Sequence, residues 1–99
     1  MDVSQQVVTI IFEAIDEANE IRPKHEWIKK DLEARLVGPE SGLDSLGLLN
    51  LVLSVEGRVN TKFGCAVDLA GILAVEPSSS PLRSVSTLAE YVGSHLPAA

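Results

Sequence analysis

The sequence is poor in cysteine and in aromatic side chains, with one Cys, one Trp, one Tyr and two Phe in 99 residues. A single cysteine, Cys65, cannot close an internal disulfide, so nothing points to the oxidising compartments where small domains are cross-linked. Residues 1–20 lack the basic start and the small-residue cleavage site of a secretory signal. No stretch approaches the roughly 20 apolar residues that cross a bilayer. We therefore expect a cytoplasmic protein without a membrane span.

Basic residues are also scarce, since 8 Lys and Arg face 14 Asp and Glu and the formal net charge is -6. Such a charge argues against the phosphate backbone of a nucleic acid or an anionic membrane as the main partner. Basic protein surfaces are the expected partners. The length of 99 residues and the hydrophobic fraction of 45% fit one globular domain that covers residues 1–99, and we expect it to be a monomer.

Strand-like alternation and internal repeats are absent, and three segments instead show helical spacing of apolar residues. The first helix is predicted from about Val3 to Glu20, and the second from Ser45 to Thr61 or Phe63. The last helix follows a cap at Ser84 or Ser86. The first and last helices are expected to bury these residues: Val7, Val8, Ile11, Ile15, Ala18, Val85, Leu88, Tyr91, Val92 and Leu96. The predicted class is all-α, a small bundle.

Two connections between these helices are less regular. Residues 21–43 read as a long connection with a helical turn or two around Trp27, Ile28, Leu32 and Leu36. Residues 64–76 are apolar and are predicted to form a loop with a short helix after Asp68. A connection as long as the first is uncommon in so small a domain, and long connections are often functional.

The stretch "GLDSLGLLNLVLSVE" places Asp44 and Ser45 at the start of the second helix. Asp44 suits the N-cap, where its carboxylate accepts hydrogen bonds from free amides and complements the helix dipole. Ser45 then holds the first helical position, beside amides that would favour an attached phosphate. Leu43 and Leu46 are expected to anchor this turn in the core. Seven of the ten residues from Leu46 to Val55 are apolar, more than one buried stripe requires, so some should face solvent or a partner.

Catalysis by Ser45 is not supported by the sequence. A nucleophilic serine needs a base within hydrogen-bond reach, and "GLDSLG" differs from the G-x-S-x-G elbow of hydrolases. The only histidines are His25 and His95, which lie in the long connection and near the C-terminus. Together with Cys65 they lack the spacing of a zinc site. We therefore expect no catalytic residue and no metal site, and we expect that the protein is not an enzyme.

The segment "LDSLGLLNLVLSVEGRV" resembles the acyl carrier protein family, in which Asp-Ser-Leu opens the second helix. The C-terminal "SVSTLAEYV", the acidic first helix, the long first loop and the low pI of about 4.7 also resemble that family. The resemblance covers most of the chain in its order of elements. It implies a small four-helix bundle with a long first loop.

The resemblance also implies that Ser45 carries 4'-phosphopantetheine, with Asp44 and Leu46 beside the attachment point. A phosphopantetheinyl transferase would transfer the group from coenzyme A. The acyl chain would then travel as a thioester to acyl-loading and acyl-processing synthase enzymes of fatty acid, polyketide or specialised lipid synthesis. In the family these partners contact the second helix, which implies the following recognition residues here: Leu43, Gly47, Leu48, Asn50, Leu51 and Glu56.

Some residues depart from the family pattern. Gly47 and Asn50 stand where acidic residues are common, and Glu56 is the only acid between Ser45 and Arg58. This departure suggests a specialised carrier, and because the chain starts at Met1 without linker-like tails a freestanding one is expected. Two alternatives remain: a peptidyl carrier of nonribosomal synthesis, or an unmodified helical protein-interaction module in which Asp44 is only a cap.

Overall fold

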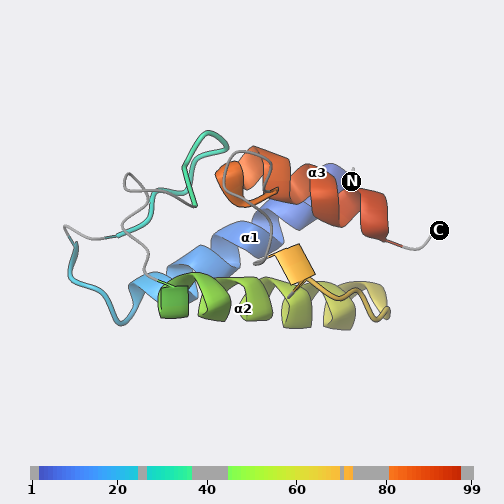
Figure 1. Cartoon of the computed structure of the whole chain (residues 1–99), viewed down its shortest axis with the longest axis horizontal. Coiled ribbons are helices and arrows are strands. Elements are labelled where there is room, and N and C mark those ends of the chain that lie inside the picture. The colour runs from blue at the N-terminus through green and yellow to red at the C-terminus, as the bar shows by residue number, and fades with distance from the viewer. Residues whose placement is uncertain (1–2, 25–26, 37–44, 70, 73–80, 97–99) are drawn as a thin grey trace.

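The computed structural model of the chain describes residues 3–24, 27–36, 45–69, 71–72 and 81–96, and the regular secondary structure of these residues is helical (Figure 1). Helix α1 spans Val3–Asn19, α2 spans Ser45–Phe63, and α3 spans Val85–His95. A 3-10 helix, η3 at Pro81–Arg83, precedes α3. The described residues contain no strand, so the all-α class is confirmed. None of these helices combines the length and the hydropathy that a bilayer-spanning segment needs.

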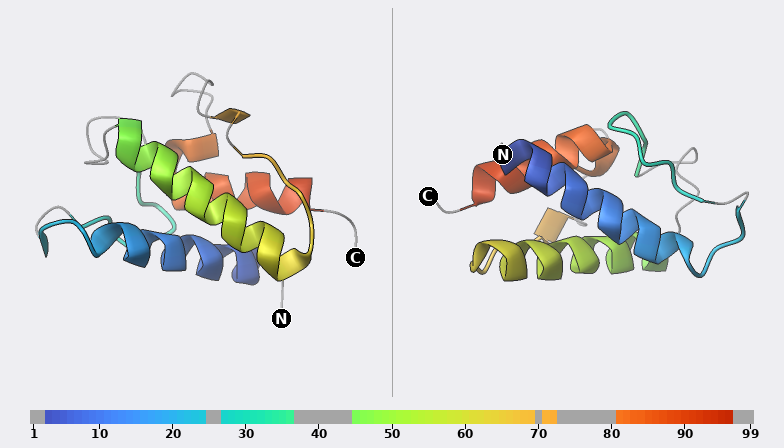
Figure 2. Two further views of the ribbon diagram at one scale, coloured as in Figure 1. Left: turned by 90° about the horizontal axis from the view of Figure 1, so that it is seen from below. Right: turned by 180° about the vertical axis from the view of Figure 1, so that it is seen from behind.

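Helix α1 packs against both α2 and α3, and the core lies between the three (Figure 2). The helical spacing of its apolar residues explains this arrangement, because one face of α1 is almost continuous in β-branched aliphatic side chains. The buried core residues are Val7, Ile10, Ile11, Ala14, Ile15, Ile28, Leu36, Leu51, Val52, Val55, Val59, Leu69, Ile72, Leu82, Val85, Leu88, Ala89 and Val92. Of the residues predicted for the buried faces, Val8, Ala18, Tyr91 and Leu96 are only partly buried.

The start of α3 agrees with one of the two predicted caps. Ser84 has extended backbone angles and its hydroxyl accepts a hydrogen bond from the Thr87 N–H, while the Thr87 hydroxyl accepts one from the Ser84 N–H. This reciprocal pair is a capping box. The backbone N–H of Ser86 instead donates to the Leu32 carbonyl, which ties α3 to the long connection.

The helical turns expected in the long connection are present only as isolated turns. The Trp27 N–H donates to the Lys24 carbonyl and the Ala34 N–H donates to the Asp31 carbonyl, and no continuous helix forms over residues 27–36. Ile28 and Leu36 are buried, but Trp27 and Leu32 are about half exposed. Beyond its own turns, the backbone of this segment is held by hydrogen bonds to the Asn19 side chain of α1 and to the start of α3.

The four-helix prediction is not confirmed, because the described residues contain three α-helices. After Asp68 a 3-10 hydrogen bond joins the Ile72 N–H to the Leu69 carbonyl. The rest of the short helix predicted there lies outside the described residues.

Candidate functional site

Ser45 is the first residue of α2, as the sequence predicts. The first amides of a helix have no partner within the helix, and the helix dipole is positive at this end. In Figure 1 this start of α2 lies at one end of the molecule, with the segment that follows α1 at the same end. Asp44 and Leu43 lie outside the described residues, so the predicted cap stays a prediction.

The first turn of α2 reaches the surface through Leu46, whose side chain is 65% exposed. The expectation that Leu46 anchors this turn in the core is therefore wrong. Leu48 takes that role, because it is partly buried and packs against the core. Helix geometry explains why Leu48 is buried and Leu46 is not. One face of α2 contains Leu48, Leu51, Val52 and Val55, and Leu46 lies outside this face.

The residues predicted to recognise a partner differ in their exposure to solvent. Asn50 is exposed, and Gly47 and Leu48 are partly buried. Leu51 is 1% exposed and belongs to the core, so its assignment to the partner surface is wrong. Glu56 is partly buried, and its carboxylate accepts a hydrogen bond of 2.6 Å from the Leu69 N–H. The one acid on α2 therefore has a structural partner within the chain.

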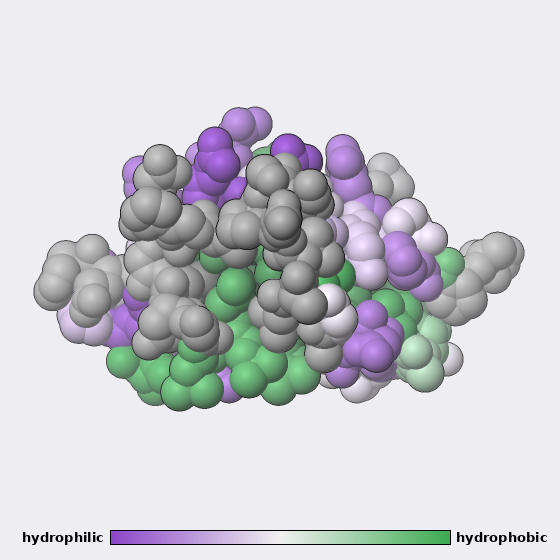
Figure 3. Space-filling model, viewed as in Figure 1, coloured by the Kyte–Doolittle hydropathy of each residue, from purple (hydrophilic) through white to green (hydrophobic). Residues whose placement is uncertain are grey.

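Two exposed leucines lie on the outer side of α2, Leu46 and Leu53, the latter 44% exposed. Figure 3 shows apolar residues gathered over the N-terminal half of this helix. Ile21, which is 87% exposed, lines a hollow together with Asn50 and Leu53. The surplus of leucine in the sequence thus appears at the surface, as predicted.

A charged network between α1 and α2 was not anticipated. The Arg58 guanidinium donates to the Glu17 carboxylate at 2.9 Å, and the Ser54 hydroxyl donates to the same carboxylate at 3.1 Å. Arg58 Nε also donates to the Ser54 hydroxyl at 3.2 Å. Glu17 nevertheless keeps 58% of its side chain exposed, so this network lies at the surface. The i, i+4 spacing of Ser54 and Arg58 could have predicted their contact from the sequence. The contact of Arg58 with Glu17 could not be predicted in this way, because it depends on how α1 packs against α2.

Among the described residues, no group of three or more His, Cys, Asp or Glu side chains is placed to hold a metal ion. His95 stacks on Tyr91 at the C-terminal end of α3, which is the opposite end of the molecule from the start of α2 (Figure 1). His25 lies outside the described residues. Cys65 is partly buried, with its sulfur 3.4 Å from Asn60 Oδ1.

The geometry thus offers a serine at a helix start, an apolar outer face on α2 and acidic side chains on α1. Comparison with known proteins adds no assignment to these features. No protein-family model, no curated protein and no solved structure matches the chain.

Proposed function

We propose that the protein carries acyl intermediates as thioesters on a 4'-phosphopantetheine arm attached to Ser45. The observation that carries this proposal is the place of Ser45, at the first residue of a 19-residue helix and at one end of the molecule. The exposed Leu46 beside it supports access to this turn. The resemblance of the segment around Asp44 and Ser45 to acyl carrier proteins supplies the chemistry.

The residues at the start of α2 fit a phosphate diester. The free amides and positive dipole end of the helix stabilise a phosphate attached there. The first turn of α2, residues 45–48, contains no acidic residue that would repel it. When bound, the group supplies a thiol on a flexible arm, and tethering raises the effective concentration of the acyl cargo for each partner.

The partners in this proposal are a phosphopantetheinyl transferase and the synthases that load and process the acyl group. In the transfer, the Ser45 hydroxyl oxygen forms a bond to the phosphorus of the pantetheine phosphate. The pyrophosphate linkage of coenzyme A breaks, adenosine 3',5'-bisphosphate leaves, and the serine proton is released. The chain's own residues contribute the hydroxyl and its presentation, and the transferase supplies the catalysis.

The test is the intact mass of the purified protein after incubation with coenzyme A, magnesium and a broad-specificity phosphopantetheinyl transferase. Wild type is expected to gain the mass of one phosphopantetheine, and Ser45→Ala is expected to gain none. Ser94→Ala, which changes an exposed serine on α3, is the control and should be modified like wild type. Modification of Ser45→Ala, or none of a folded wild type beside a working carrier, would contradict the proposal.

A second candidate is an unmodified helical interaction module. The exposure of Leu46, Leu53 and Ile21 favours it, because exposed apolar side chains that gather on one face commonly mark a binding surface. Under this function Asp44→Ala would lose about 1 kcal/mol of stability through the missing cap, while Ser45→Ala would leave partner binding unchanged. A peptidyl carrier differs from the leading proposal only in cargo, and loading assays with acyl and aminoacyl groups separate the two.

A further inference from the structure

A groove follows the seam between α1 and α2 on the outer surface. It consists of two adjoining hollows of about 590 and 500 Å³ that share Glu17, Leu53 and Ser54. We call it the seam groove. The lining residues on which the inference depends are Glu13, Glu17, Glu20, Ile21, Leu53 and Gly57.

The α2 side of the seam groove is apolar and has unused space. Leu53, at the junction of the two hollows, is 44% exposed. One turn further along the helix, Gly57 is exposed, and a Cβ built there would meet no atom within 4 Å. A glycine inside a helix costs roughly 1 kcal/mol relative to alanine, and internal packing does not require it at this position. A surface that approaches α2 closely would require it.

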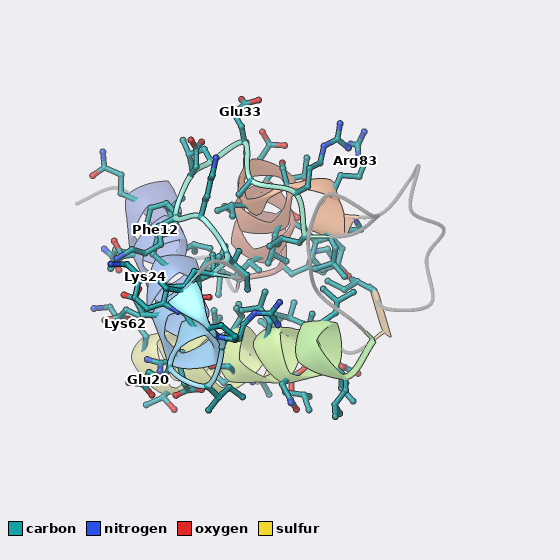
Figure 4. The ribbon with its side chains drawn as sticks, turned by 90° about the vertical axis from the view of Figure 1, so that its left-hand side faces the viewer. Phe12, Glu20, Lys24, Glu33, Lys62 and Arg83 are labelled. Atoms are coloured by element: carbon teal, nitrogen blue, oxygen red, sulfur yellow. The ribbon has the colours of Figure 1, made fainter. Side chains whose placement is uncertain are left out.

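The charges of the seam groove come mainly from α1. Glu13 and Glu17 are more than half exposed, and Glu20 is exposed. The hollow that contains Ile21 includes Glu17 and Glu20 but no basic lining residue. Glu17 is neutralised by Arg58 at 2.9 Å, whereas the Glu20 carboxylate has no ion-pair partner among the residues that the structure describes. Figure 4 shows Glu20 and Lys62, one from each hollow, on the same side of the molecule.

We propose that the seam groove is the docking site for the transferase that modifies Ser45. The docking element is an amphipathic segment of that enzyme: an apolar side chain inserts beside Leu53 and Gly57, and a Lys or Arg pairs with Glu20. Charge complementarity supports this occupant, because Glu20 lines the Ile21 end of the groove with no basic residue in that hollow. On its other side Glu20 lines a hollow that contains Lys24, Lys29 and Lys30. Leu53 lies eight residues after Ser45, about 12 Å along the helix axis, so a docked enzyme reaches the serine. This inference rests on the proposed function, and it assigns the charged contacts to α1 in place of α2.

The test measures docking apart from modification. Ser45→Ala protein is titrated onto the immobilised broad-specificity phosphopantetheinyl transferase with coenzyme A present, and further substitutions are added to this background. Gly57→Gln places a side chain in the open groove and is expected to weaken binding about tenfold, the cost of displacing one apolar contact. Gly93→Gln is the matched control. Gly93 also lies in a helix, and a Cβ added there would meet no atom within 4 Å. It does not line the groove. It should bind like the background protein.

The charge is tested separately with Glu20→Gln. Its binding is expected to be about threefold weaker at low salt and equal to the background protein at high salt, because exposed ion pairs are weak and screened. Glu33→Gln, at an exposed position that does not line the groove, should change nothing. Both glycine variants should have a melting temperature no lower than that of the background protein, because glutamine favours a helix more than glycine does. This result would exclude unfolding as the cause of weak binding.

The outcomes separate the two proposals. If wild type gains phosphopantetheine but Gly57→Gln binds as tightly as Gly93→Gln, the carrier function stands and the seam groove is not the docking site. If wild type is neither modified nor bound, the carrier function fails and the docking inference fails with it. Modification of wild type together with selective loss of binding in Gly57→Gln supports both.

Discussion

The side-chain amide of Asn19 makes two hydrogen bonds with the backbone of Ile28. Asn19 Nδ2 donates to the Ile28 carbonyl at 3.0 Å, and the Ile28 N–H donates to Asn19 Oδ1 at 2.9 Å. Asn60 repeats this arrangement with Val67, at 3.1 and 2.8 Å. Each long helix thus has an asparagine in or near its last turn that fixes the chain seven to nine residues later. These contacts replace regular secondary structure in the two connections.

Asn19→Ala is expected to destabilise the protein by about 2–3 kcal/mol, because it leaves two backbone groups of the buried Ile28 without partners. Asn19 itself is 7% exposed, so water cannot easily replace its amide. Urea unfolding followed by circular dichroism measures the change. Asn50→Ala, at an exposed position of α2, should change stability by less than about 0.5 kcal/mol. Equal effects of the two variants would contradict the structural role of Asn19.

Glu56→Ala is expected to cost about 1–2 kcal/mol, because the buried Leu69 loses the acceptor for its N–H. Glu56→Gln retains a carbonyl oxygen at the same reach and should cost roughly half as much. Chemical denaturation of both variants beside Glu90→Ala, an exposed acid of α3, provides the comparison. A loss in Glu56→Gln as large as that in Glu56→Ala would show that the carboxylate acts through its charge and not as an acceptor.

The helices were predictable because they depend on local pattern. The periodic aliphatic residues of α1 and α2 gave bounds that agree with Val3–Asn19 and Ser45–Phe63 to within a residue or two. Residues 27–36 were not predictable, because their apolar spacing imitates a helix while Asn19 and the start of α3 supply the actual hydrogen bonds. Those partners are distant in sequence, and tertiary contacts override local propensity.

The candidate site likewise has features that the sequence predicts and features that it does not. The place of Ser45 at the start of α2 followed from the turn residues before it and the apolar run after it. Which leucines face outward did not follow, because a helix with apolar residues on most sides leaves its orientation to its neighbours. Leu51 is therefore buried and Leu46 exposed, the reverse of their predicted roles. The pairing of Arg58 with Glu17 likewise depends on how α1 crosses α2.

The Arg58 and Glu17 pair is expected to contribute little to stability. Both side chains are substantially exposed, at 35% and 58%, and exposed pairs contribute about 0.2–1 kcal/mol. A double-mutant cycle with Arg58→Gln and Glu17→Gln should give a coupling free energy in that range at low salt and a smaller one in 0.5 M NaCl. A coupling well above 1 kcal/mol that resists salt would contradict this expectation and show that the pair is shielded from solvent.

The two serines at the start of α3 differ in role, and single substitutions should separate them. Ser84→Ala removes the oxygen that accepts from the Thr87 N–H and is expected to cost about 1 kcal/mol, the usual loss for an N-cap. Ser86 lies inside the helix and uses its backbone N–H, not its hydroxyl, to bond Leu32, so Ser86→Ala should be neutral or slightly stabilising. Thermal unfolding of both variants measures the difference. If Ser86→Ala is the more harmful change, the helix is capped by Ser86, two residues after Ser84, and the bond between the Ser84 hydroxyl and the Thr87 N–H does not stabilise the helix.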